Sequence, residues 1–198
     1  MSADDAAGNI SAIIVSGGRS ERFGSDKAAI KLDGRTLIEH VLDAVAPVVD
    51  DVVVVGPWAP NGLAASIEPE PLEGPLGALA WGLELCSSPH ALLVACDHPL
   101  LVPGLLREFV RMRGDADAVV ARADGRPEPL VAVYSHDCLS VANALLDSGE
   151  RSMRALLAAI DVRWIDPHEW RVHDPNGNSF VDIDTPEDLE RLTGGRLE

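Results

Sequence analysis

Basic residues are scarce in this chain, which has 16 Lys plus Arg against 32 Asp plus Glu and a formal net charge of −16 at pH 7. A nucleic-acid partner needs a basic protein face for its phosphate backbone, so this charge argues against DNA or RNA binding. Only Lys27 and Lys31 are lysines, and both lie within or just after one glycine-containing loop. An anionic nucleotide would therefore have to be bound by a local basic loop and a divalent cation.

Cysteine and long apolar runs are scarce as well. Cys86, Cys96 and Cys138 are odd in number and far apart, which favours neither a disulfide framework nor a zinc site, and we expect all three to be buried. No run approaches the roughly 18 apolar residues of a membrane span, and segment 1–9 lacks the basic and hydrophobic regions of a secretory signal. We expect a cytoplasmic protein without membrane contact, with a disordered tail at 1–9.

Apolar segments of strand length alternate with amphipathic segments of helix length, which is typical of an α/β fold with a mainly parallel sheet. The length of 198 residues and the hydrophobic content of 46% suggest a single domain, placed at 10–193, with a C-terminal tail at 194–198. The expected strands are 11–16, 51–55, 64–67, 91–95, 117–121, 130–134 and 162–165. The expected helices are 36–46, 75–86, 103–112, 137–147, 151–160 and a last one opened by Thr185 and Pro186.

The loop after the first expected strand concentrates glycines and cations. Gly17 and Gly18 let main-chain N–H groups approach an anion, while Arg19, Arg22 and Lys27 supply charge-assisted hydrogen-bond donors. The loop lies where a parallel strand would end, which is the edge where open α/β sheets bind ligands. It is therefore predicted to hold a nucleotide triphosphate.

Two familiar phosphate-binding motifs do not describe this loop. A P-loop has four residues between its glycines, whereas five separate Gly18 from Gly24, and the run Gly17-Gly18-Arg19 breaks the dinucleotide-binding spacing. The pattern Gly-Gly-x-Ser-x-Arg-x-Gly-x-Asp-Lys-Ala instead resembles the signature of the molybdenum cofactor guanylyltransferases, a MobA-like nucleotidyltransferase family. Further similar segments are 74–78, 96–100, 149–153 and 184–189, so the resemblance covers nearly the whole chain from 11 to 192.

This resemblance implies a fold and a reaction. The fold is a three-layer Rossmann-like sandwich with a mainly parallel central sheet, of the nucleotide-diphospho-sugar transferase type. The reaction is Mg²⁺-dependent transfer of GMP from GTP to molybdopterin or the molybdenum cofactor, forming molybdopterin guanine dinucleotide and releasing pyrophosphate. Besides GTP and this acceptor, it implies transient contact with molybdoenzymes or cofactor-handling proteins.

The resemblance also assigns residues. It places catalytic roles on Lys27, Arg22 and Asp97. The nucleotide-binding residues that it implies are Ser16, Gly17, Gly18, Arg19, Ser20, Lys27, Glu68, Gly77 and Asp97. Asp97 follows the apolar run 92–96, so its carboxylate would emerge from a buried strand as a rigid oxygen ligand for Mg²⁺. The alternative for Asp97 is a residue that only caps the turn before Pro99.

Three acidic residues depart from the family pattern. Glu68 stands where a guanine-reading aspartate is usual, with Glu70 as its neighbour if the alignment slips. Asp182 and Asp184 stand where two amides are typical. They would repel the acceptor's phosphate if they faced it and would strengthen metal binding if they faced the cation. We hypothesise that Asp184 joins Asp97 around a cation.

The acceptor side corresponds to family segments that border the pterin phosphate, here 125–130 and 149–153. The predicted acceptor-binding residues are Arg126, Arg151, Asp182 and Asp184, although solvated arginines are an alternative for the first two. Histidine is common in the family where Glu128 stands. Two other functions stay open: a cytidylyltransferase of the same superfamily, and a nucleotide-binding protein without turnover.

Overall fold

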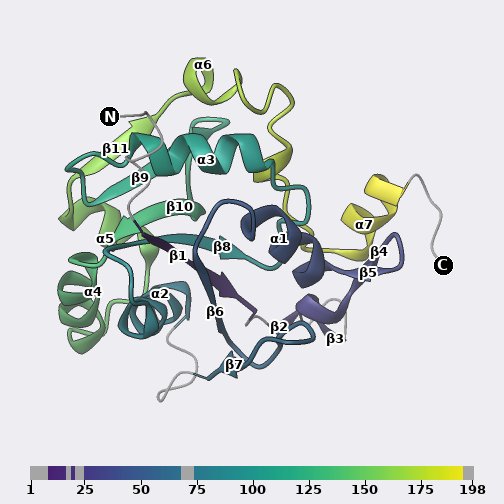
Figure 1. Cartoon of the computed structure of the whole chain (residues 1–198), viewed down its shortest axis with the longest axis horizontal. Helices are drawn as coiled ribbons and strands as arrows, with labels where there is room; N and C mark the ends of the chain where they lie inside the picture. The colour runs from purple at the N-terminus through teal and green to yellow at the C-terminus, as the bar shows by residue number, and fades with distance from the viewer. Residues whose placement is uncertain (1–8, 17–18, 21–24, 68–73, 194–198) are drawn as a thin grey trace.

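Seven strands form one central sheet in the computed structural model of this chain, in the order β11-β9-β10-β8-β1-β6-β7 (Figure 1). The structure describes residues 9–16, 19–20, 25–67 and 74–193. The strands of the sheet are β1 (Ile10–Val15), β6 (Asp51–Val55), β7 (Ala65–Ser66), β8 (His90–Ala95), β9 (Ala118–Ala123), β10 (Arg126–Ser135) and β11 (Val162–Ile165). Within this sheet only β10 runs antiparallel to its neighbours, β8 and β9, so the predicted mainly parallel α/β fold is confirmed.

Helices cover both faces of the sheet, as the three-layer prediction requires (Figure 1). They are α1 (Leu37–Val45), α2 (Gly74–Leu85), α3 (Pro103–Met112), α4 (Cys138–Asp147) and α5 (Met153–Ala159). One core cluster joins α1 and α3 to the sheet, and a second joins α2, α4 and α5 to the opposite face. Successive residues of β1 point to opposite faces, so Ile14 belongs to the first cluster and Ile13 to the second. Both side chains are fully buried, which explains why this strand is apolar throughout.

Several short elements lie outside the predicted pattern. They are β2 (Arg19–Ser20), β3 (Ser25–Asp26), η1 (Lys27–Ala29), β4 (Lys31–Leu32), β5 (Arg35–Thr36), α6 (Pro167–Trp170) and η2 (Asn178–Phe180), and α7 (Pro186–Thr193) is the predicted last helix. Strand β10 begins four residues before the predicted 130–134, because its first half is polar and more exposed and so carries no apolar signal. The predicted tails at 1–9 and 194–198 lie almost wholly outside the described residues.

Helix capping and cysteine burial agree with what the sequence predicts. The backbone N–H of Thr36 donates to the Glu39 carboxylate over 2.8 Å, as the capping box predicts. All three cysteines are buried, as expected. Among the described residues, no helix has both the length and the apolar character needed to cross a membrane.

Candidate active site

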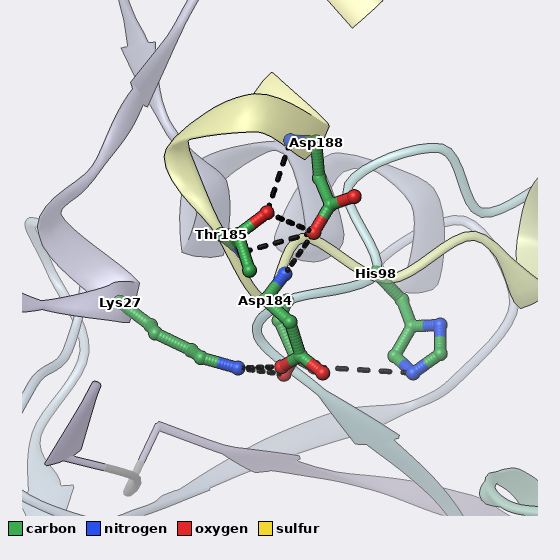
Figure 2. Close-up of polar contacts among 6 residues, drawn as sticks. Lys27, His98, Asp184, Thr185 and Asp188 are labelled. Carbon is green, nitrogen blue, oxygen red and sulfur yellow. Dashed lines mark hydrogen bonds and ion pairs between the residues drawn. The ribbon is translucent and has the colours of Figure 1, made fainter. Parts of the chain in front are cut away.

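Three side chains from distant parts of the chain meet beyond the carboxyl ends of β1 and β8. Lys27 opens η1, Asp97 follows β8, and Asp184 precedes α7. The Nζ atom of Lys27 lies 3.0 Å from Oδ2 of Asp97 and also donates a hydrogen bond to Oδ1 of Asp184. Figure 2 shows Lys27 and Asp184 pointing toward one another beside His98. One ammonium group therefore bridges two carboxylates.

The parallel pairing of β1 with β8 brings Asp97 to this position. Val15 pairs with Ala95, and the N–H of Cys96 donates to the carbonyl of Val15 over 2.9 Å, so both strands end at the same edge. The loop that carries Lys27 leaves β1 at the point where Asp97 leaves β8. The carbonyl of Asp97 accepts from the N–H of Ile183 over 2.9 Å, which attaches the C-terminal segment to the same place.

The first turn of α7 holds the backbone of Asp184. The carboxylate of Asp188 accepts hydrogen bonds from the hydroxyl of Thr185 at 2.8 Å, the N–H of Thr185 at 2.9 Å and the N–H of Asp184 at 3.2 Å (Figure 2). These bonds lower the pKa of Asp188, because they favour its ionised form. In return, the Thr185 hydroxyl accepts from the N–H of Asp188 at 3.2 Å. The predicted N-cap Thr185 is thereby confirmed, and Asp184 is positioned by a reciprocal cap.

The electrostatics of this centre keep Lys27 charged. Burial opposes the charged ammonium, but the hydrogen bonds and negative charges of Asp184 and Asp97 outweigh it and raise the pKa of Lys27 above its ordinary value. The side chains of Lys27 and Asp97 are only 15% and 19% exposed, whereas that of Asp184 is 53% exposed. The centre is therefore open to solvent on the side of Asp184.

One oxygen of Asp97 suits a hard cation. Its Oδ1 atom is buried and has no hydrogen-bond partner in the part of the chain that the structure describes. The Nε2 atom of His98 lies 3.8 Å away, which is too far for a hydrogen bond, and Nδ1 of the same ring lies 3.2 Å from the carbonyl of Ser179. A buried oxygen without a partner is costly, and carboxylate oxygens are the ligands that Mg²⁺ takes from proteins. Asp97 and Asp184 therefore fit the predicted metal-binding role.

A separate cavity of about 540 Å³ lies next to the carboxyl end of β9 and the start of β10. Its wall includes Arg126, Glu128, Trp170, Arg171, Asn176 and Phe180. Burial, together with the negative charges of Asp182 and Asp124, raises the pKa of the Glu128 carboxyl to about 7, against the opposing effect of Arg126. Two of the predicted acceptor-binding residues, Arg126 and Asp182, thus lie around the same carboxyl group.

The predicted nucleotide site is described only in part. Gly17, Gly18, Arg22 and Glu68 lie outside the described residues, and Arg19 and Ser20 are described only by their backbone in the hairpin of β2 and β3. Ser16 is buried at the end of β1, where its hydroxyl accepts from the N–H of Trp58 at 3.2 Å. Gly77 is buried in α2. The roles of these residues remain predictions.

Arg151 is not one of the residues that line this cavity. It occupies the loop between α4 and α5, where its guanidinium donates to the carbonyls of Leu146 at 2.7 Å and Glu150 at 3.1 Å. Its acceptor-binding role also remains a prediction. Sequence patterns could not predict that Arg171 and Asn176 border the cavity, because both lie in irregular segments without a periodic pattern.

Comparisons with known proteins agree with this architecture. Residues 12–164 match the family model of the MobA-like NTP transferase domain. A molybdenum cofactor guanylyltransferase of Desulfosudis oleivorans is 35% identical over 198 residues, covering 95% of this chain and 98% of the relative. A probable molybdenum cofactor guanylyltransferase of Chloroflexus aggregans is 33% identical over 195 residues, covering 91% and 92%.

Solved structures show the same fold. Molybdopterin-guanine dinucleotide biosynthesis protein A of Archaeoglobus fulgidus superposes with a TM-score of 0.80 at 23% identity, covering 93% of this chain and 97% of that one. A 2-C-methyl-D-erythritol 4-phosphate cytidylyltransferase of Thermus thermophilus gives a TM-score of 0.68 at 22% identity, covering 94% and 98%. On the family match and the identities to the curated relatives, the chain belongs to the MobA-like NTP transferase family.

Proposed function

We propose that this protein transfers GMP from GTP to the terminal phosphate of molybdopterin or its molybdenum-bearing form. The family and its curated relatives, which are molybdenum cofactor guanylyltransferases by name, support this assignment. The observation that carries it is the contact of Lys27 with Asp97 and Asp184 at the edge of the sheet. A centre with one fixed cation and two carboxylates can bind the phosphates of a nucleotide together with a divalent ion.

The reaction needs positioning and charge neutralisation more than proton transfer. An oxygen of the acceptor's phosphate forms a bond to the α-phosphorus of GTP, and the bond to the leaving pyrophosphate breaks. The attacking phosphate is already ionised near neutral pH, so no side chain has to deprotonate it. Lys27 neutralises charge that develops on the leaving group. Asp97 and Asp184 would hold Mg²⁺, which supplies further neutralisation of the phosphate oxygens when it is bound.

The proposed reaction also requires that the protein select guanine and bind the acceptor. The guanine preference is inferred from the family likeness, because Glu68 lies outside the described residues. On the acceptor side, Arg126 borders the 540 Å³ cavity, where a guanidinium group suits a phosphate oxygen. We place the reaction in the cytoplasm, with transient delivery of the product to molybdoenzymes or cofactor-handling proteins.

Product formation tests the proposal. The protein is incubated with Mg²⁺, molybdopterin and GTP labelled at the α-phosphate, and labelled guanine dinucleotide is separated by chromatography. We expect product with GTP and much less with CTP, and a loss of about a hundredfold in Asp97→Asn, because a lost metal ligand removes roughly 3 kcal/mol of transition-state stabilisation. Asp147→Asn, at an exposed position at the end of α4, is the matched control and should retain activity.

Two results would contradict the proposal. Equal product formation from CTP would favour the cytidylyltransferase alternative. Tight binding of GTP without any pyrophosphate release in the presence of acceptor would favour a nucleotide-binding protein without turnover.

A further inference from the structure

Packing contacts and a hydrogen bond hold Trp170 in the wall of the 540 Å³ cavity. Trp170 is buried, packs edge-on against Phe180 with ring centroids 5.0 Å apart, and donates from Nε1 to the carbonyl of Arg122 over 3.0 Å. Gly177 lies against the Trp170 ring, where an added Cβ would stand 3.4 Å from Cη2. These contacts fix one side of the cavity against β9.

The loop that completes this wall is held by a buried carboxylate. Asp174 is 1% exposed and accepts from the N–H groups of Asn178 at 3.0 Å and Ser179 at 2.8 Å. The guanidinium of Arg171 lies 5.1 Å above the ring centroid of Trp170, which places its charge on the cavity wall. These contacts hold the loop in place on the side of the cavity formed by Trp170.

The charges on this wall are mixed. Arg126 and Arg171 provide cations, whereas Asp124 and Glu128 provide carboxyl groups. Two cations suit an anionic ligand, but two ionised carboxylates would cancel that attraction. The protonation of the carboxyl groups therefore decides whether the cavity accepts an anion.

We propose that Glu128 controls acceptor binding in this cavity: as a neutral acid it donates a hydrogen bond to an oxygen of the anionic acceptor, and as a carboxylate it repels that acceptor. This inference rests on the proposed function for the identity of the acceptor. Glu128 stands on β10, lines the cavity together with Arg126 and Arg171, and is affected by the charge of Asp182. It is thus a specificity-determining residue and takes no part in the bond-making step.

The groups around Glu128 set the pH at which this control operates. Partial burial and the charges of Asp182 and Asp124 favour the neutral acid, whereas Arg126 favours the carboxylate. Arg171 is a further cation on the same wall. The resulting pKa of about 7 puts the change within the physiological range. The neutral fraction then falls about tenfold between pH 6 and pH 8.

Asp182 and Asp184 place the cavity next to the reacting centre. Asp182 influences Glu128 by its charge, and two residues later Asp184 contacts Lys27. Between them, Ile183 is fully buried and its N–H is bonded to the carbonyl of Asp97. An acceptor held beside Glu128 would therefore have its phosphate close to the nucleotide.

The test uses the full chain and neopterin monophosphate, a phosphate-bearing pterin, as the probe in calorimetric titrations at pH 6 and pH 8. We expect the affinity of the wild type to fall about tenfold more than that of Glu128→Gln over this interval. The phosphate of the probe also titrates, but identically for both proteins. Glu84→Gln, at an exposed position on α2, is the matched control and should follow the wild type.

A second variant probes the same group without replacing it. Asp182→Asn removes a negative charge beside Glu128, so the midpoint of the pH dependence should move to lower pH. A Glu128→Gln variant whose affinity falls as steeply as that of the wild type would overturn the inference. Absence of probe binding to the wild type at both pH values would overturn it as well.

Failure of this inference is distinguishable from failure of the proposed function. If guanine dinucleotide forms and Glu128→Gln keeps the wild-type pH profile, only the role of Glu128 is wrong. If the pH-dependent binding appears but no dinucleotide forms from GTP, the cavity binds pterin phosphates and the proposed reaction is wrong.

Discussion

The carboxyl group of Glu128 should make the free protein less stable as the pH rises from about 4.5 to about 7. Its pKa is raised from the ordinary 4.5 to about 7 by burial and by Asp182 and Asp124. The folded state therefore binds this proton more tightly than the unfolded state does. The stabilisation is complete below about pH 4.5 and is lost as the pH rises to about 7. Replacement by glutamine removes this pH dependence while keeping the shape of the side chain.

The magnitude follows from the difference between the two pKa values. A rise from 4.5 to about 7 corresponds to at most about 3 kcal/mol of the free energy of unfolding. Part of this difference is already lost below about pH 5.5, so about 2 kcal/mol of it falls between about pH 5.5 and about pH 8. For a chain of this size, such a change shifts the melting temperature by roughly 4–8 °C.

Urea denaturation and thermal melts of the wild type and Glu128→Gln, at about pH 5.5 and about pH 8, measure this effect without any ligand. We expect the stability of the variant relative to the wild type to rise by about 2 kcal/mol between the two conditions. A difference between the two proteins that stays constant with pH would refute the reasoning, because it would show that Glu128 has similar pKa values in the folded and unfolded states.

Two further predictions concern packing and the reacting centre. Gly82→Ala would place a Cβ 2.6 Å from Cγ2 of Ile13, where α2 packs on β1. We therefore expect the free energy of unfolding, measured by urea denaturation, to fall by about 1–3 kcal/mol. An unchanged denaturation midpoint would show that the contact relaxes freely. Lys27→Met removes the ammonium that contacts Asp97 and Asp184, so Mn²⁺ should bind the nucleotide-free protein about tenfold more tightly, as followed by electron paramagnetic resonance. Equal or weaker Mn²⁺ binding would mean that Lys27 does not compete for these oxygens.

Much of the fold was predictable because its buried parts have a clear pattern. The apolar runs of β1 and β8 are buried on both faces, so they stand out in the sequence as continuous hydrophobic segments. The two-residue strands β4 and β5 have no such signal, because their pairing depends on one tight turn at Asp33 and Gly34, both with positive φ. Helix α6 does begin with a capping box of Asp166 and Glu169, but at four residues it is too short to show an apolar period, and the three residues of η2 show none either.

The reacting centre was predictable for the same reason, whereas the cavity was not. Asp97 and Lys27 follow strands that end at one edge of the sheet, so their proximity follows from parallel pairing. The hypothesis that Asp184 lies beside Asp97 agrees with the contacts that Lys27 makes with both carboxylates. The cavity depends on where the irregular segment around Trp170 folds back onto β9. No local pattern predicts that contact, which is why the surroundings of Glu128 emerged only from the structure.

The central claim is that Lys27 and Asp97 act on one bound nucleotide in a shared centre, and a double-mutant cycle tests it most directly. Affinities for Mg·GTP are measured by calorimetry for the wild type, Lys27→Met, Asp97→Asn and the double variant. Because the two groups are 3.0 Å apart, we predict strongly non-additive losses, with a coupling of about 1 kcal/mol or more. Additive losses, or wild-type affinity in both single variants, would contradict the account.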